Sequence, residues 1–179
     1  AMENAIAILR DEKIPMLFRI AIFHYLIGYI HPFYDGNGRL SRFISSYLLK
    51  EDVNVFVALK LSYAIKKNKK QYYKAFKITN DYKNRGDLTY FIYVFIEFIY
   101  DAMMSVYEDI LYLFNKLISY MEIIYKSNFD NFDKAILSVL AQVNGFSDNE
   151  LYISELKELT KINEPTLRER LEKLIIDGY

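Results

Sequence analysis

The sequence predicts an all-α protein, and its composition, apolar spacing and scarcity of helix breakers support this. The chain has 179 residues, 53% of them hydrophobic and 17% aromatic, which is enough to fill a full core and excludes a disordered chain. It contains only six glycines and three prolines, so long helices can run without interruption. Apolar residues recur three and four positions apart along most of the chain, which is the period of an amphipathic helix.

Two helices are expected before residue 31. A short amphipathic helix covers 3–11, and a longer one runs from Pro15 to Ile30. Pro15 suits the first helical position, because its missing N–H would have no partner there. The apolar residues of the second helix cover much of its circumference, so we expect that helix to be central and buried. Pro32 ends it, since a proline ring cannot continue a helix.

The remaining elements are expected to be helical as well. A turn at 35–38 precedes a helix from Arg39 to Lys50. Asp87 is expected to cap a long aromatic helix from Leu88 to about Tyr125, because its side-chain oxygen can accept a hydrogen bond from a free backbone N–H. The further helices are expected at 60–67, 69–83, 132–143, 154–161 and 164–177.

The best candidate for a domain boundary is the polar stretch Asn128–Asn131. We expect a helical core over residues 1–127 and a small module over residues 128–179. Three short helices with a tight turn between the second and third are typical of a winged-helix domain. Gly178 is a strong helix stop, and a wing hairpin would begin at Tyr179, so either this module is truncated before its wing or the wing lies outside this sequence.

The formal net charge of zero conceals an uneven distribution. Residues 130–179 carry ten acidic and six basic side chains, which leaves +4 for residues 1–129. The acidic excess lacks the footprint of a DNA-binding surface, so DNA is not expected as a partner, and we favour protein interaction or dimerisation for this module. The basic run Lys66–Lys70 is either a solvated helix face or an attractor for a polyanion.

The chain contains no cysteine, which excludes disulfides and thiolate metal sites. It shows no apolar run of transmembrane length and no signal-peptide pattern at its start, so no membrane association is expected. These observations predict a cytoplasmic protein.

The stretch from His31 to Arg42, HPFYDGNGRLSR, is the one part of the chain that core packing does not explain. His31 is a candidate general base, because an imidazole accepts a proton near neutral pH. Asp35 offers the hard carboxylate oxygen that Mg²⁺ prefers. Phe33 lies between two polar positions and is expected to anchor the loop in the core.

The second half of this stretch has the residues of an anion site. Gly36 and Gly38 allow positive φ and close approach, so backbone N–H groups at the start of the next helix can bind an anion. The Asn37 side chain supplies a further donor. Arg39 and Arg42, three residues apart, can grip phosphate from the same side. Together with the base and the carboxylate, these residues predict a nucleoside-triphosphate site. By contrast, His24 has no carboxylate or cysteine near it in the sequence, and we interpret it as structural.

The twelve residues resemble the full signature of the Fic domain family, His-x-Phe-x-Asp/Glu-Gly-Asn-Gly-Arg-x-x-Arg, at every specified position. The segments Leu61–Tyr63, Tyr72–Phe76 and Gly86–Asp87, with Asn68, are similar to the downstream segments of Fic proteins that carry a C-terminal winged helix. The resemblance implies a Fic-like helical core. It also implies transfer of the AMP part of ATP to a Tyr, Thr or Ser hydroxyl of a protein, with release of pyrophosphate.

The resemblance also implies roles for the site residues. His31 would deprotonate the target hydroxyl, and Asp35 would hold the Mg²⁺ that bridges the phosphates of ATP. The turn Gly36–Gly38, with its central asparagine, would stabilise charge on the α-phosphate, while Arg39 and Arg42 would hold the β- and γ-phosphates. The partner is then a target protein with an exposed hydroxyl side chain; self-modification and homodimer formation stay open.

Two features of the family are not found in this sequence. No hairpin flap of the kind that aligns the target precedes the motif. The family's inhibitory Ser/Thr-x-x-x-Glu-Gly/Asn helix is also missing, with Glu3-Asn4 as a partial echo only. Tyr72 and Tyr73 either line the base side of the nucleotide or pack in the core. The alternatives are another Fic reaction (AMP removal, UMP transfer or phosphate transfer) and a winged-helix DNA-binding regulator with a vestigial nucleotide site.

Overall fold

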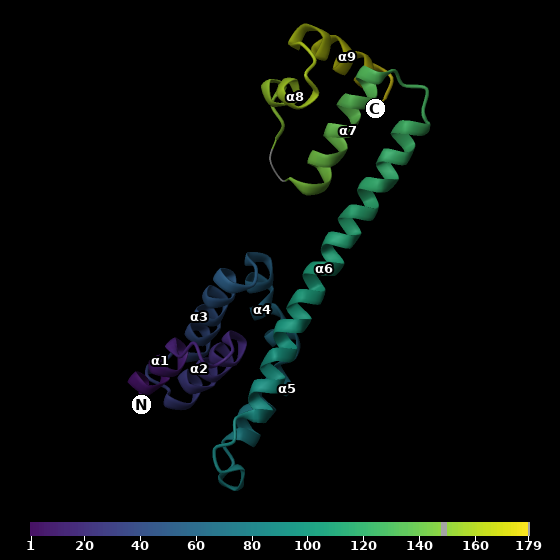
Figure 1. Cartoon of the computed structure of the whole chain (residues 1–179). Helices are drawn as coiled ribbons and strands as arrows, with labels where there is room; N and C mark the ends of the chain where they lie inside the picture. Colours follow the sequence, from purple (N-terminus) through teal and green to yellow (C-terminus); the bar gives the residue numbers. More distant parts are fainter. Residues whose placement is uncertain (148–149, 179) are drawn as a thin grey trace. The chain divides into compact units, whose positions relative to one another are not determined.

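The computed structural model describes residues 1–147 and 150–178, and within them every regular element is a helix (Figure 1). The prediction of an all-α fold is therefore confirmed. The helices are α1 (Met2–Arg10), α2 (Met16–Ile30), α3 (Asn37–Asp52), α4 (Val55–Lys67), α5 (Lys69–Thr79), the 3₁₀ turn η1 (Tyr82–Asn84), α6 (Thr89–Lys126), α7 (Asn131–Phe146), α8 (Ile153–Thr160) and α9 (Glu164–Ile176).

The chain divides into two compact units, Ala1–Glu108 and Asp109–Tyr179. The division falls within α6, which is continuous through it. A domain boundary at residues 127 and 128, as the sequence suggests, stays a prediction.

The core of the first unit is built around α2, as its apolar circumference predicts. α2 packs against α1 and α3, and α3 packs in turn against α4. Ile20 and Tyr25 of α2 share one buried cluster with Leu61 of α4, Tyr72 of α5 and Phe95 of α6. This packing brings the end of α2 and the start of α3 together, and the sequence between them is the loop of interest.

Helix boundaries differ from the expectations where a local cap decides them. Pro15 lies just outside α2, with φ −52° and ψ 137°, and its carbonyl accepts hydrogen bonds from Phe18 and Arg19. α4 begins at Val55 rather than at residue 60, because the Asn54 side chain accepts the Phe56 N–H. α5 ends at Thr79, short of the expected residue 83.

Other starts and stops follow their expected signals. α3 begins at Asn37, two residues early, because Gly36 adopts the left-handed conformation that ends the turn. Asp87 Oδ1 accepts the Thr89 N–H at 2.8 Å at the start of α6. Hydrogen bonds from the side chain and the backbone of Thr89 hold the pKa of the Asp87 carboxyl below its usual range.

In the second unit, α7, α8 and α9 enclose a small core. Its buried side chains are Ile136, Leu156, Ile162, Leu167 and Leu174. Asp130 caps α7 and Asn163 caps α9, each through its side-chain oxygen. The described residues of this unit include no strand, so the winged-helix assignment stays a prediction. The expected wing at Tyr179 lies outside the described residues.

One helix of the described chain, α6, is long and apolar enough to cross a membrane by length and composition alone. The expectation that no run reaches this length was therefore wrong. The signal arises because α6 begins as a core helix, with Phe91, Phe95 and Phe98 each 1% exposed. Core helices pass the same test, so the finding is weak evidence for a membrane span.

Candidate functional site

The loop between α2 and α3 is set by two left-handed residues. His31 ends α2 with φ 51° and ψ 56°, and its N–H bonds the Ile27 carbonyl. Gly36 has φ 87° and precedes the first helical residue, Asn37. The first N–H groups of a helix have no partner within the helix and carry partial positive charge. Residues 31–36 therefore lie beside a helix end that favours anions.

Asn37 fastens this loop. Its side chain is 4% exposed, its Oδ1 accepts the Phe33 N–H at 3.0 Å, and its Nδ2 donates to the Phe33 carbonyl at 2.6 Å. The same Nδ2 lies 3.1 Å from His31 Nδ1. Phe33 itself is 54% exposed, so the prediction that its ring anchors the loop was wrong. The side-chain amide of Asn37 therefore holds the loop, and its N–H groups are engaged by the Phe33 carbonyl and the His31 ring.

His31, the candidate base, and Asp35, the candidate metal ligand, are both exposed. Asn37 contacts the His31 imidazole and thereby orients it. Asp35 accepts the Gly36 N–H at 2.6 Å through Oδ1 and pairs with Arg39 Nη2 at 3.2 Å through Oδ2. Among the described residues no group of three metal-ligating side chains gathers. Asp35 can therefore supply one ligand to a cation, with the others coming from phosphate and water.

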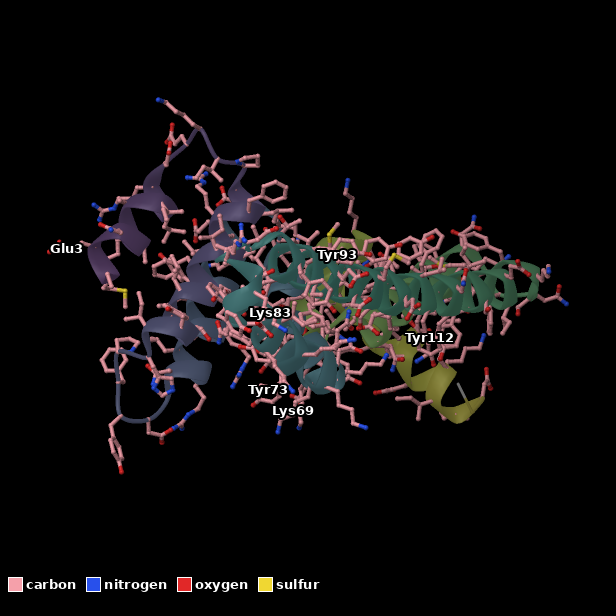
Figure 2. All side chains as sticks on the ribbon, turned by 90° about the horizontal axis from the view of Figure 1, so that it is seen from below. Glu3, Lys69, Tyr73, Lys83, Tyr93 and Tyr112 are labelled. Atoms are coloured by element: carbon pink, nitrogen blue, oxygen red, sulfur yellow. The ribbon has the colours of Figure 1, made fainter. Side chains whose placement is uncertain are left out.

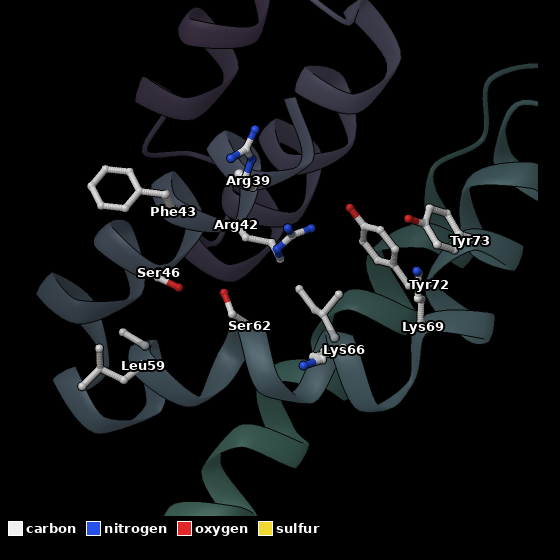
Figure 3. A pocket seen from close by; sticks show the side chains of 12 residues that line it. Arg39, Arg42, Phe43, Ser46, Leu59, Ser62, Lys66, Lys69, Tyr72 and Tyr73 are labelled. Carbon is white, nitrogen blue, oxygen red and sulfur yellow. The ribbon is translucent and has the colours of Figure 1, made fainter. Parts of the chain in front are cut away.

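A cavity of about 660 Å³ lies between α3, α4 and α5 (Figure 3). Arg39 and Arg42 line it from α3, while Lys66 and Lys69 line it from the other two helices. The lining residues that the structure describes include four cations and no acid. They are Arg39, Arg42, Phe43, Ser46, Ala58, Leu59, Ser62, Ile65, Lys66, Lys69, Tyr72 and Tyr73. Such a lining favours a polyanion over a neutral ligand.

The aromatic side of the cavity is formed by α5. Figure 2 places Lys69 beside Tyr73, and the ammonium lies 5.7 Å from the ring centroid. Tyr72 is 6% exposed, and its hydroxyl lies 2.9 Å from Nε2 of the fully buried His24. Tyr72 therefore belongs both to the core and to the cavity wall. Lining the side of the cavity where the nucleotide base would lie and packing in the core are therefore compatible roles for Tyr72.

Burial shifts the pKa of both His24 and Tyr72. Loss of water lowers the pKa of His24 to about 3, and the charge of Arg42 acts in the same direction. Burial likewise raises the pKa of the Tyr72 hydroxyl to about 12, against the opposing effect of Arg42. Both groups are therefore neutral at physiological pH. The interpretation of His24 as a buried structural histidine fits this position.

The structure brings the predicted site residues together in two groups. Arg39 and Arg42 reach the cavity, whereas His31, Asp35 and the 36–38 turn form the loop at the start of α3. Sequence reasoning missed Ser46 and Ser62 as lining residues. For Ser46 a signal existed, since it lies one helical turn after Arg42. The basic run Lys66–Lys70 also pointed to this cavity through two of its members.

Comparison with known proteins supports the motif. Residues 1–49 match the model of the Fic/DOC family, a range that holds α1, α2, most of α3 and the complete stretch from His31 to Arg42. A comparison with solved structures found no match. Over residues 1–49, the chain is therefore similar to the Fic/DOC family.

Proposed function

We propose that this protein is an adenylyltransferase, which moves the AMP part of ATP to a Tyr, Thr or Ser hydroxyl of a protein. One observation carries the proposal: an exposed histidine, His31, lies in an anion-favouring loop at the start of α3, and the same helix lines a cationic cavity. The match of residues 1–49 to the Fic/DOC family supports a Fic-type function, and the arrangement of charges supports use of a triphosphate.

The cavity suits the phosphates of a nucleotide. Arg39 and Arg42 lie on consecutive turns of one helix face, and planar guanidinium groups bind phosphate oxygens in pairs. Lys66 and Lys69 add two charges from the opposite wall. Four cations match the four negative charges of a fully ionised nucleoside triphosphate, whereas the phosphodiester of an AMP-modified protein carries one charge and would leave three of them unmatched. This favours transfer from ATP over removal of AMP from a protein.

The loop and the start of α3 would stabilise the charge that develops on the reacting phosphate. The free N–H groups at the start of α3 can donate to oxygens of the α-phosphate, where charge builds up during attack. Asn37 keeps these groups in place because its amide fastens residue 33 to the helix start. The loop thus supplies preorganised donors, which is the main requirement of phosphoryl-type transfer.

His31 would take the proton. The target hydroxyl oxygen bonds to the α-phosphorus, the bond from that phosphorus to the bridging oxygen breaks, and pyrophosphate leaves with the bonding electrons. The hydroxyl proton passes to the imidazole. The exposed position of His31 suits this role, since the hydroxyl belongs to another protein.

Mg²⁺ is the expected metal, and Asp35 fits it in part. Its carboxylate is 83% exposed and provides hard oxygen ligands. When bound, Mg²⁺ would neutralise phosphate charge. Asp35 must then release Arg39, and this exposed ion pair is weak enough to open at little cost.

The test is transfer of label from α-labelled ATP with Mg²⁺, both to the purified chain and to proteins of a cell extract. We expect labelled protein with the wild type and at least a hundredfold loss with His31→Ala, because general-base catalysis contributes on this scale. Tyr34→Ala is the matched control, since Tyr34 lies in the same loop and is fully exposed. Equal labelling by the wild type and His31→Ala would refute the proposal.

The same assay separates the alternatives. Label from γ-labelled ATP would indicate phosphate transfer, and label from α-labelled UTP would indicate UMP transfer. Loss of AMP from a modified protein would indicate the reverse reaction. A DNA-binding regulator is disfavoured by the net charge of −4 over residues 130–179, and strong salt-sensitive binding to duplex DNA would favour it.

A further inference from the structure

A chain of buried polar groups runs beneath the cationic cavity. His24 of α2 contacts Ser45 Oγ of α3 through Nδ1 at 2.9 Å and the Tyr72 hydroxyl of α5 through Nε2 at 2.9 Å. These three side chains are 0%, 1% and 6% exposed. Arg42 also acts on His24 and Tyr72, since its charge lowers the pKa of both. The mechanism above uses neither the histidine nor the serine.

The donors and acceptors around His24 decide which of its ring nitrogens carries the hydrogen. The imidazole is neutral, so one ring nitrogen donates and the other accepts. A backbone hydrogen bond to Ser41 also acts on the ring, and because Ser41 lies one helical turn before Ser45, we assign it to the nitrogen that Ser45 contacts. A carbonyl can only accept, and Nδ1 therefore carries the hydrogen. Nε2 is then the acceptor, and the Tyr72 hydroxyl donates to it.

In this direction the Tyr72 oxygen can still accept, and the side chains of Ser41 and Arg42 both act on it. Figure 3 shows the Tyr72 hydroxyl and the Arg42 guanidinium pointing toward each other across the cavity wall. Burial raises the pKa of Tyr72, and the charge of Arg42 and side-chain contacts with Ser41 and Arg42 oppose this rise, as donation to the phenol oxygen requires. On its own helix Arg42 lies over the first turn of α3, since a Cβ on Gly38 would be 3.4 Å from its Nη1. The guanidinium thus lies between the start of α3 and the Tyr72 side chain of α5.

We propose that His24 is a positioning residue that, through the Tyr72 hydroxyl, holds the Arg42 guanidinium in the orientation that binds the terminal phosphates of a nucleoside triphosphate. The proposal rests on the proposed function for the identity of the ligand. A histidine that only fills the core would not need two hydrogen-bonded neighbours, because an apolar residue of similar volume fills the same space at no cost in unsatisfied polar groups. His24 instead connects Ser45 of α3 to the Tyr72 hydroxyl in the cavity wall.

The first test is nucleotide affinity by calorimetry. Tyr72→Phe keeps the ring and removes only the hydroxyl, and we expect about tenfold weaker binding of ATP with less than a twofold change for AMP. His24→Leu is expected to behave in the same way, whereas His24→Gln, which can still accept from Tyr72, is expected to recover most of the affinity. In an Arg42→Ala background, Tyr72→Phe should have no further effect.

Thr79→Val is the matched control. It removes another buried hydroxyl from α5, one that has no hydrogen-bond partner in the described part of the chain. ATP affinity should stay within twofold of the wild type. Equal weakening of ATP and AMP by Tyr72→Phe, or an undiminished effect in the Arg42→Ala background, would overturn the proposal, since a general loss of structure affects both ligands.

A second measurement does not depend on nucleotide. The side-chain NMR signals of Arg42 should be sharp in the wild type, because a held guanidinium rotates slowly, and should broaden in Tyr72→Phe and His24→Leu. Unchanged signals in both variants would overturn the positioning role. If the signals respond as expected but the wild type binds no ATP, the positioning stands and the proposed function fails.

Discussion

His24 makes the stability of the first unit depend on pH. Its pKa is lowered to about 3 in the folded chain, against 6.5 when exposed. A base with a depressed pKa favours the folded state only while it is neutral. Its contribution is therefore fully present above pH 6.5 and is lost progressively as the pH falls from 6.5 towards 3.

We expect the wild type to lose roughly 2 kcal/mol of unfolding free energy between pH 7.5 and pH 5 through this group alone. His24→Gln cannot titrate and should lose correspondingly less over the same range. Urea denaturation at each pH measures both. Parallel curves for the two proteins would contradict the assignment of the buried neutral imidazole.

At the residue scale, the sequence predicted the loop and the arginines of the cavity better than it predicted which side chain holds the loop in place. The motif predicted the loop, the helix start and two arginines of the cavity, because those residue types have few other uses at that spacing. It assigned the anchoring of the loop to Phe33, since an aromatic ring is the usual core residue. The loop is fastened by Asn37 instead, and which of two neighbouring side chains is buried depends on the fold around them.

At the scale of the helices, Gly28 of α2 lies directly against the Phe76 ring of α5. A Cβ at this position would lie 2.7 Å from Cε1 of Phe76. That ring cannot move aside, because it packs against Tyr25, Tyr72 and Phe91 with centroids 4.7 to 5.6 Å away. Glycine is thus required here by packing, although it weakens an isolated helix.

Gly28→Ala is therefore expected to destabilise the chain by about 1–3 kcal/mol, the usual cost of overpacking. Gly145→Ala is the matched control, because it lies within α7 with no atom within 4 Å of its added Cβ. That variant should gain about 0.5–1 kcal/mol from helix propensity. Guanidinium denaturation compares them, and equal stability of the two variants would disprove the close approach.

The helices themselves were predictable because apolar periodicity is strong, and only their ends moved. α4 starts five residues early at its Asn54 cap, and α5 stops four residues early at Thr79. The start of α4 depends on one side chain meeting one N–H, which a sequence pattern does not reveal. The cavity was not predictable in the same way, because its walls come from three helices.

At the scale of the whole molecule, the two units differ in what stabilises them. The second unit holds α7 and α9 together through Arg170, which pairs with Asp130 and with the buried Asp133. The Asp133 side chain is only 7% exposed, so loss of its partner would leave a carboxylate in an apolar setting. The first unit contains no part of this network.

Arg170→Ala should therefore lower amide-exchange protection in α7 and α9 while leaving ATP affinity within twofold of the wild type. Lys173→Ala serves as the control, since Lys173 is an exposed residue of the same helix, and its protection pattern should match the wild type. Unchanged protection with Arg170→Ala would mean that the network adds nothing to the packing of α7 and α9.

The Asp35–Arg39 pair in the loop has a consequence for how the site fills. With each partner satisfied by the other, neither offers a full charge to a stray cation or anion. A metal arriving alone must compete with the guanidinium, and a phosphate arriving alone must compete with the carboxylate. If the proposed function holds, metal and nucleotide arriving together would exchange both partners at once, and because the pair is exposed and weak this exchange would cost little.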